Sequence, residues 1–343
     1  MGFSMMLNAK QNYLGTSIRQ VKEHCLSEMQ LLLKQAKKNL ESNGFQVQVA
    51  ESVSQVREYI ASVLHRNAPV LLAGTSIDKE LGLYGFLTSL GHHMIDAGPA
   101  NRALRILNLQ PRHPIFPLFG YRKQEIYDKL KSYYGNKDLS ITDWQEEHYK
   151  LLAGAGTGIT GCTALAVQEG VILISEEKEN IHIASLLPPV HIVVVGMEKL
   201  VHTIEEALLV ARGVAYYGAR KPVCRNLFFI SGPSATADIQ GVIVRGMHGP
   251  REVHVILLDN GRTAALDKAE RDLLMCIECG CCLKSCRVYQ NKGPVFSETR
   301  KPPFYSWWAL AKGGYDGDCL QCGECARACP LNINIAKLQK EGD

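Results

Sequence analysis

Two stretches near the C-terminus set the organisation of the chain: CIECGCCLKSC at residues 276–286 and CLQCGECARACP at residues 319–330. In each stretch, cysteines recur at intervals of three, three and four residues. The first run supplies Cys276, Cys279, Cys282 and Cys286, and the second supplies Cys319, Cys322, Cys325 and Cys329. Three thiolates at this spacing on a tight loop can bind three corners of one cubane, so the pattern predicts two 4Fe-4S clusters.

This spacing is that of two-cluster bacterial ferredoxins, in which the fourth cysteine of each run binds the other cluster. The predicted ligands are therefore Cys276, Cys279, Cys282 and Cys329 for one cluster, and Cys319, Cys322, Cys325 and Cys286 for the other. Cys281 could compete as a ligand, but the spacing favours its neighbour Cys282. Arg287 stands where the first run would end in proline.

Two other uses of cysteine fit the pattern less well. A structural zinc site needs four ligands, commonly two C-x2-C pairs, and two complete runs exceed that number. Disulfides are expected in secreted chains, and neither a signal peptide nor a paired-loop spacing points to them here.

Composition narrows the class of protein. A chain of 343 residues can form one large domain and a small one, or two medium ones. Its net charge of +4 is weak and spread out, which gives no reason to expect nucleic-acid binding. The N-terminus lacks the basic and apolar regions of a signal peptide, and Met6 occupies the position where myristoylation needs Ser or Thr. No apolar run reaches the length of about 18 residues that a membrane span needs. We therefore expect a cytoplasmic protein without a membrane span.

Apolar periodicity predicts strands and helices in alternation, which favours an α/β fold with a parallel, helix-covered sheet. The expected strands lie at 45–50, 68–74, 92–98, 171–175, 187–196, 227–231 and 253–258. The expected helices lie at 17–43, 52–66, 75–90, 121–135, 144–153, 201–220, 234–240 and 265–275. We predict an N-terminal helical segment over 1–45, an α/β domain over 46–262 and a small ferredoxin-like iron–sulfur domain over 263–343.

Several glycine-rich turns are candidate ligand sites. Gly156, Gly158 and Gly161 match the dinucleotide-binding fingerprint in letters, but a helical pattern precedes them where that fingerprint needs a strand. We expect instead a flexible loop at 156–160 before a helix of small residues. At Gly232-Pro233-Ser234, Ser234 could cap a helix whose free N–H groups bind an anion, or serve as a cap alone.

Ligand crevices of open parallel sheets lie at the carboxyl ends of strands. We therefore predict that the candidate pocket residues converge on one cleft. This set comprises Gly156, Gly158, Thr160, Gly232, Pro233, Ser234, Asp238, His248 and Gly249. His113, between prolines, could be a ligand or a packing residue.

Five segments carry a resemblance to a known family: GITGCTALAV, EGVILISEEKEN, LPPVHIVVVGMEKLV, GPSATADIQ and RGMHGPREVHVILLDNG. They resemble the LUD-domain proteins of lactate utilisation, and in particular those that carry an iron–sulfur domain. The resemblance implies a sheet like that of sugar-phosphate isomerases and CoA transferases, and a place in a cytoplasmic complex that oxidises L-lactate to pyruvate. The family usually reads AETGT where this chain has VQEGV at residues 167–171, so Glu169 is a further pocket candidate. The chain also ends soon after Cys329, as a shortened member serving a different electron route would.

Two functions follow from these observations. In the first, the chain is an electron-transfer subunit. A cubane takes one electron at a time, whereas oxidation of a hydroxy acid releases two, and no flavin motif is present. This function therefore needs either a partner or an undetected cofactor. The candidate partners are other subunits of the complex and a ferredoxin or flavoprotein. Trp307 and Trp308 could contribute to such a contact. In the second, the LUD domain is itself catalytic on an organic acid or thioester, with Asp238, His248 and Glu169 as candidates.

Overall fold

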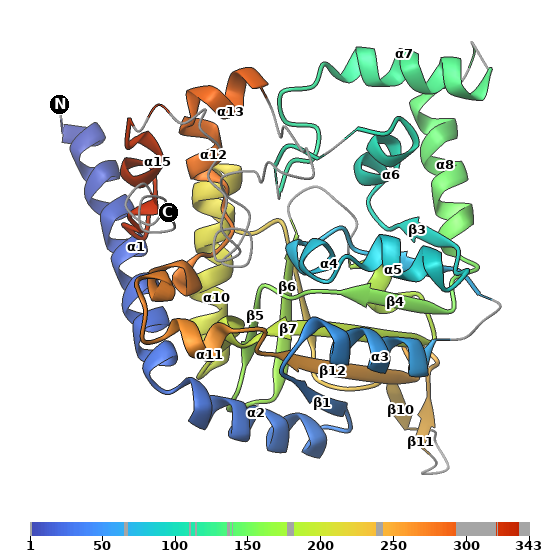
Figure 1. Ribbon diagram of the computed structural model, residues 1–343, viewed down its shortest axis with the longest axis horizontal. Helices are drawn as coiled ribbons and strands as arrows, with labels where there is room; N and C mark the ends of the chain where they lie inside the picture. The colour runs from blue at the N-terminus through green and yellow to red at the C-terminus, as the bar shows by residue number, and fades with distance from the viewer. Residues whose placement is uncertain are drawn as a thin grey trace.

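A six-stranded parallel sheet in the order β1-β12-β7-β4-β2-β3 forms the centre of the protein (Figure 1). The computed structural model describes residues 2–64, 68–109, 111–113, 115–135, 138, 140–176, 182–237, 243–292, 320 and 322–335. The strands are β1 (Gln46–Ala50), β2 (Val70–Leu72), β3 (Met94–Asp96), β4 (Thr157–Thr160), β7 (Val190–Gly196) and β12 (Glu252–Leu258). All seven residues of β7 are buried, as expected for a strand covered on both faces. The predicted α/β class with a parallel sheet is confirmed.

Three helices cover one face of this sheet: α3 (Val53–Val63), α4 (Ser76–Glu80) and α5 (Leu83–Ser89). Their buried residues, among them Ile60 and Leu87, pack with Ile159 and Ile192 of the sheet. Gly82 has a φ of 55° and separates α4 from α5, where the sequence predicted one helix.

A second sheet, in the order β8-β5-β6-β9, packs on the other face together with α10 (Ile204–Gly213) and the two N-terminal helices. Its strands are β5 (Ala164–Ala166), β6 (Val171–Glu176), β8 (Leu200–Val201) and β9 (Asn226–Ile230). The helix of small residues expected after the glycine segment is β5 instead. Ala164 pairs with Leu173 of β6, so pairing with a strongly apolar strand outweighs the helix preference of alanine.

Other helices also differ from the prediction. The expected helix at 17–43 is two helices, α1 (Gly2–Ser27) and α2 (Met29–Ser42), which meet at Glu28. The expected helix after Ser234 is strand β10 (Ala235–Ala237), paired with β11 (Ile243–Arg245). The segment before the first cysteine run forms α11 (Arg262–Ala265) and a 3₁₀ helix, η3 (Ala269–Met275). A π-helix, η2 (Val214–Ala219), extends α10, and a 3₁₀ turn, η1 (Met197–Lys199), follows β7.

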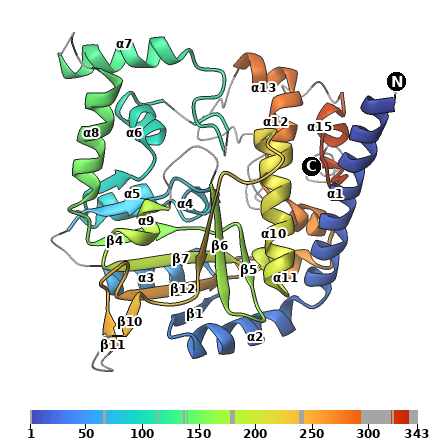
Figure 2. The ribbon, with the colours of Figure 1, turned by 180° about the vertical axis from the view of Figure 1, so that it is seen from behind.

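Four helices complete the α/β domain. The first three, α6 (Pro99–Ile106), α7 (Lys123–Tyr134) and α8 (Ile141–Leu152), share a small apolar cluster that includes Trp144. The guanidinium of Arg102 lies 4.1 Å from the Trp144 ring centroid. The short helix α9 (Ile183–Leu186) packs against β4 and β7, on the face of the sheet that is turned to the viewer in Figure 2.

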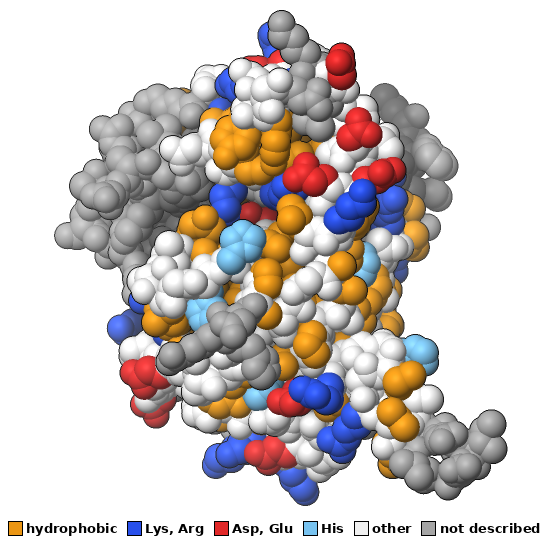
Figure 3. Space-filling model, turned by 90° about the vertical axis from the view of Figure 1, so that its right-hand side faces the viewer, with side chains coloured by type: hydrophobic (Ala, Val, Ile, Leu, Met, Phe, Trp, Pro, Cys, Tyr) orange, Lys and Arg blue, Asp and Glu red, His pale blue; other side chains and the backbone are white. Residues whose placement is uncertain are grey.

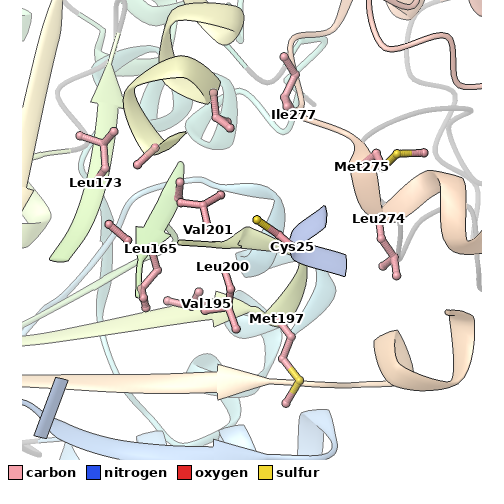
Figure 4. Packing of buried hydrophobic residues seen from close by; sticks show 14 of the residues in the cluster. Cys25, Leu165, Leu173, Val195, Met197, Leu200, Val201, Leu274, Met275 and Ile277 are labelled. Atoms are coloured by element: carbon pink, nitrogen blue, oxygen red, sulfur yellow. The ribbon is translucent and has the colours of Figure 1, made fainter. Parts of the chain in front are cut away.

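The described part of the cysteine-rich region forms α12 (Cys281–Ser285), α13 (Arg287–Lys292) and α15 (Glu324–Arg327). These helices lie beside α1 and α10 in both ribbon views (Figures 1 and 2). Leu331 and Ile333 belong to the same apolar cluster as Leu14 and Ile18 of α1. In Figure 4, Ile277 and Met275, on the segment leading into this region, lie close to the core residues of the second sheet. The helix α1 therefore packs against both parts of the protein.

Basic and acidic side chains are interspersed on the face shown in Figure 3, in keeping with the small net charge. Within the described ranges, none of the helices combines the length and the apolar character that crossing a membrane requires.

Candidate functional site

A cleft of about 150 Å³ opens at the carboxyl ends of β2, β4 and β7. Thr75 and Ser76 follow β2, Gly161 follows β4, and Lys199 lies in the turn after β7. These turns are neighbours because their strands are neighbours in a parallel sheet, and such a position is where ligands bind in open α/β folds.

One wall of the cleft belongs to the first cysteine run. Ile277 and Glu278, which line it, stand between Cys276 and Cys279. The carboxylate of Glu278 accepts a 2.6 Å hydrogen bond from Ser76 Oγ and lies 3.1 Å from Lys199 Nζ. The segment that carries two of the predicted cluster ligands is thereby tied to the turns of the central sheet.

A buried ion-pair network lies at the base of the cleft. Arg262, of which 1% is exposed, binds both carboxylate oxygens of Glu80 at 2.8 Å and also pairs with Glu198. Burial lowers the pKa of Arg262, but the two carboxylates outweigh it and raise that pKa overall. Burial alone would raise the pKa of Glu198, and Arg262 holds it below its usual value. The network is therefore charged, and it fixes the turns after β7 and β12 to α4.

Three further ionisable side chains line the cleft. Burial lowers the pKa of Lys79 to about 8, against the opposing effect of Asp78 and Glu278. Burial also lowers the pKa of His113 to about 3, and raises that of the Cys162 thiol to about 12. At neutral pH the histidine and the thiol are uncharged, while most of Lys79 remains cationic. Lys79 therefore adds a cation to a cleft whose lining also includes Lys199, Arg262 and four glutamates.

The structure shows whether His113 is a packing residue or faces a ligand site. Its side chain is buried, and Nδ1 accepts hydrogen bonds from the backbone N–H groups of Ile115 at 3.1 Å and Phe116 at 3.2 Å. The opposite nitrogen, Nε2, faces the backbone of Gly280, where an added Cβ would lie 2.2 Å away. His113 thus packs its loop against the first cysteine run while also lining the cleft.

The cysteines of the first run fit a cluster of thiolate-bound iron. Burial raises the pKa of Cys276 to about 12, and raises the pKa of Cys282 well above its usual value. Cys329 adds to both shifts, which places it beside these two residues although it is distant in the sequence. Several buried thiols can all become thiolates only if bound cations compensate their charge, and iron supplies that compensation.

Backbone geometry in the two runs also suits thiolate ligands. The N–H of Glu278 donates to Cys276 Sγ at 3.4 Å, and the N–H of Tyr289 donates to Cys286 Sγ at 3.5 Å. Gly280 and Gly323 have φ values of 73° and 70° at equivalent places in the two runs. Cys281 Sγ donates to the Tyr217 carbonyl at 3.1 Å.

Cys322 and Cys325 of the second run are described, whereas Cys319 and the two tryptophans Trp307 and Trp308 lie outside the described residues.

The glycine segment is not a loop, and the structure does not bring it into the cleft. Gly158 and Thr160 belong to β4, in the middle of the sheet, and Gly156 immediately precedes that strand. An added Cβ at Gly158 would lie 1.7 Å from the Ala184 carbonyl oxygen, so this glycine permits α9 to pack closely on the strand. Thr160 Oγ1 is hydrogen-bonded to His191 at 2.9 Å.

The Gly-Pro-Ser turn and the HGP turn do lie together, away from the cleft lining. Ser234 Oγ accepts from the N–H of His248 at 3.2 Å, and an added Cβ on Gly249 would lie 3.4 Å from Ser234 Cβ. Gly249 precedes β12, which places this pair of turns towards the amino ends of the parallel strands. Gly232 approaches the Asn43 backbone, since its added Cβ would lie 2.5 Å from that carbonyl oxygen, and Pro233 lies beside it.

The remaining candidates are placed as follows. His248 is exposed, and Asp238 lies outside the described residues. Glu169 occupies the turn between β5 and β6, where its carbonyl accepts a 2.8 Å hydrogen bond from Asn43 Nδ2. The prediction treated turns before strands and turns after strands alike, although only the latter lie at the carboxyl ends.

Sequence reasoning missed most residues that do line the cleft, including Lys79, Lys199, Arg262 and Glu278. Each follows a buried strand within a few residues or lies inside a cysteine run. A position shortly after a predicted strand could therefore have identified these residues as candidates for the cleft lining. The segment Gly74-Thr75-Ser76 was the clearest such position.

The fold and the cysteine geometry define an iron–sulfur protein in which an α/β domain and a cluster-binding module share one core. Comparison with protein families gives the same division. The chain belongs to the LUD domain family, whose model matches residues 33–258, and a 4Fe-4S dicluster domain model matches residues 272–333. The protein therefore combines a LUD domain with a ferredoxin-like domain that holds two 4Fe-4S clusters.

Curated relatives match over most of the chain. A lactate utilization protein B from Bacillus cytotoxicus is 27% identical over 333 residues, which cover 93% of this chain and 68% of the relative. A protein of the same name from Macrococcus caseolyticus is 26% identical, with 94% and 69% covered. Among solved structures, a DUF162 family protein from Deinococcus radiodurans is 17% identical, with a TM-score of 0.39 over 67% of this chain and 98% of that one.

Proposed function

We propose that this chain is the iron–sulfur electron-transfer subunit of a cytoplasmic complex that oxidises L-lactate, or a related organic acid, to pyruvate. The names of its relatives support lactate utilisation as the setting. The observation that carries the electron-transfer role is the position of Ile277 and Glu278. They line the cleft of the LUD domain and are flanked by two cluster ligands, Cys276 and Cys279.

The proposed ligand sets are those that the spacing indicates. The first cluster is held by Cys276, Cys279, Cys282 and Cys329, and the second by Cys319, Cys322, Cys325 and Cys286. Cys329 raises the pKa of both Cys276 and Cys282, which supports the crossed arrangement of the first set. The bond of Cys281 to the Tyr217 carbonyl supports leaving that cysteine outside both sets.

The cleft suits a small anionic reactant. The Lys79 amino group is the cation whose pKa lies nearest neutrality among the described cleft residues, and it can pair with a carboxylate. The cleft also contains Lys199, which pairs with Glu278, and Arg262, which pairs with Glu80 and Glu198. When bound, the clusters take up and release one electron at a time. Removal of two electrons from a hydroxy acid therefore requires a two-electron acceptor, such as a flavin on a partner subunit. That acceptor would pass electrons singly to the clusters, and a ferredoxin could receive them from the clusters one at a time.

A second function is that the LUD domain is itself catalytic on an organic acid or thioester. The observation that favours it is the presence of Cys162, Lys79 and His113 in one cleft, since a thiol, an amine and an imidazole are the groups that acyl chemistry uses. Asp238, His248 and Glu169 stay predictions for this role. In this case the iron–sulfur domain would supply electrons to chemistry that the cleft performs.

Anaerobic turnover distinguishes the two functions. The cluster-loaded chain is mixed with L-lactate and a one-electron acceptor, first alone and then with its co-purifying partners. We expect cluster bleaching and turnover only when partners are present. Robust turnover by the chain alone would instead establish the catalytic LUD domain. Reduction by another organic acid, and not by lactate, would show that the substrate of the relatives does not apply here.

Glu278→Gln gives a structural check on the same assay. The variant keeps the length of the side chain and both cysteines but removes the charge that holds Lys199. Lactate-dependent cluster reduction should slow while the iron content is unchanged. Glu324→Gln is the matched control, because Glu324 lies in the second run and pairs with the exposed Arg327.

A further inference from the structure

A group of metal-binding side chains lies apart from the cysteine runs, where α1, β8 and α10 meet. Cys25 is buried near the end of α1, His202 follows β8, and Glu206 lies in the first turn of α10. Figure 4 shows Cys25 beside Val201 and Leu200 of β8. We propose that Cys25, His202 and Glu206 bind a single zinc-like divalent cation, in addition to the two iron–sulfur clusters.

The distances among the three ligand atoms match a tetrahedral site. Cys25 Sγ lies 3.3 Å from His202 Nδ1 and 3.7 Å from Glu206 Oε2, and the last two atoms are 3.3 Å apart. Zinc bonds of about 2.0–2.3 Å at tetrahedral angles require ligand atoms about 3.3–3.6 Å apart. The three atoms thus form one face of a coordination tetrahedron, and the fourth position is left for water or another ligand.

A carboxylate behind the histidine completes the arrangement. The other ring nitrogen of His202, Nε2, lies 3.0 Å from Glu28 Oε2. Ligand histidines commonly donate this second N–H to a carboxylate, which fixes the tautomer and directs the lone pair of the first nitrogen at the metal. Glu28 stands where α1 gives way to α2, and His24 stacks on the His202 ring at 4.6 Å. The ring is therefore held on both its edge and its face.

The ligand types select the class of cation. A thiolate and an imidazole favour zinc and similar transition metals, whereas magnesium and calcium prefer all-oxygen sites. Burial and the neighbouring Glu206 raise the pKa of Cys25 to about 12, so the thiolate there needs a bound cation to form.

The site lies beside the VQEGV turn at residues 167–171. The backbone N–H of Gln168, in the VQEGV turn, donates to the His202 carbonyl at 2.9 Å. Gln168 and His202 also line a shallow groove with Asn39 of α2. A metal here would connect three segments that are distant in the sequence: the α1–α2 junction, the start of α10 and the VQEGV turn.

Metal analysis of the cluster-loaded full chain tests the proposal. After equilibration with zinc and removal of excess, we expect about one zinc per chain alongside the cluster iron. X-ray absorption at the zinc edge should show one sulfur neighbour at about 2.3 Å and nitrogen or oxygen neighbours at about 2.0 Å. Cys25→Ala and His202→Gln should each lose the zinc and keep the iron. Cys224→Ala is the control, since Cys224 lies outside both cysteine runs and should retain both metals.

The carboxylate behind the histidine gives an independent readout. Glu28→Gln should weaken zinc binding by roughly 10–100-fold without abolishing it. Glu23→Gln is matched to it, because Glu23 is a nearby carboxylate in α1 that pairs with Arg19 and not with His202. Zinc that stays bound in Cys25→Ala, a zinc edge showing three or four sulfur neighbours, or the absence of bound zinc in the parent chain would each overturn the proposal. The second of these results would place the zinc among the cluster cysteines.

Discussion

Ser76 Oγ donates a 2.6 Å hydrogen bond to the carboxylate of Glu278, joining residues that are 202 positions apart in the chain. Ser76 begins the helix after β2, and Glu278 stands between Cys276 and Cys279, two of the proposed cluster ligands. The bond therefore links the cleft of the LUD domain to the loop around the first cluster. Lys199 forms an ion pair with the other oxygen of the same carboxylate, so three residues take part in this link.

The crossed ligation predicts an uneven loss of iron on substitution. Cys329→Ser should damage the cluster held by Cys276, Cys279 and Cys282, leaving roughly four of about eight irons. Cys281→Ser is the matched control, and it should keep all of the iron. Iron analysis with EPR of the reduced protein measures both. Loss of the second cluster on removing Cys329 would contradict the assignment.

Gly158 should not tolerate a side chain. In Gly158→Ala the new methyl group would collide with the Ala184 carbonyl, so β4 or α9 must shift, and we expect a loss of stability of about 3 kcal/mol. Gly154→Ala has nothing within 4 Å of its added Cβ and should be close to neutral. Thermal denaturation of the two variants side by side tests this. Equal stability would mean that the close contact is readily relieved.

The Glu80–Arg262–Glu198 network should be sensitive to loss of its centre. Arg262→Met leaves two buried carboxylates without their cation, which we expect to destabilise the protein by about 3–5 kcal/mol. Lys37→Met removes one partner of the exposed pair with Glu41 and should change stability by about 1 kcal/mol or less. Denaturant titration followed by circular dichroism compares them.

Anion binding in the cleft should weaken as the pH rises. The pKa of Lys79 is lowered to about 8 by burial, so its positive charge is present below pH 8 and lost above it. The affinity for L-lactate should then fall above pH 8, by up to roughly tenfold per pH unit. Titration calorimetry across this range measures it. Lys79→Met should bind weakly at every pH, whereas Lys131→Met, on the surface helix α7, should keep the original profile.

The arrangement of the fold followed from the sequence where strands were long and apolar. The runs that became β7 and β12 are buried on both faces and were readily found. Short strands were harder, because Ala164 to Ala166 form β5 by pairing with β6 and β8, and local sequence preference does not contain these contacts. Ser234 was expected to cap a helix for the same reason, although its chain continues into a hairpin.

The cysteine ligands and the cleft differ in how far the sequence predicts them. Cysteines that bind iron–sulfur clusters follow a spacing that the cluster geometry dictates, so the sequence predicted the two-cluster domain that the family comparison shows. Cleft residues such as Lys199 and Arg262 come from separate turns and meet only because β7 and β12 are adjacent in the sheet. The glycines misled the prediction, since Gly158 serves packing against α9.

The shared wall between the cleft and the first cysteine run has a kinetic consequence. Any electron that passes from a molecule in the cleft to the first cluster crosses a separation set by the backbone around Glu278, without a docking event. That step should be independent of protein concentration and nearly independent of ionic strength, whereas transfer onward to a separate protein should depend on both. A ferredoxin supplied as a separate protein would lack this wall, and would have to reach its donor by diffusion.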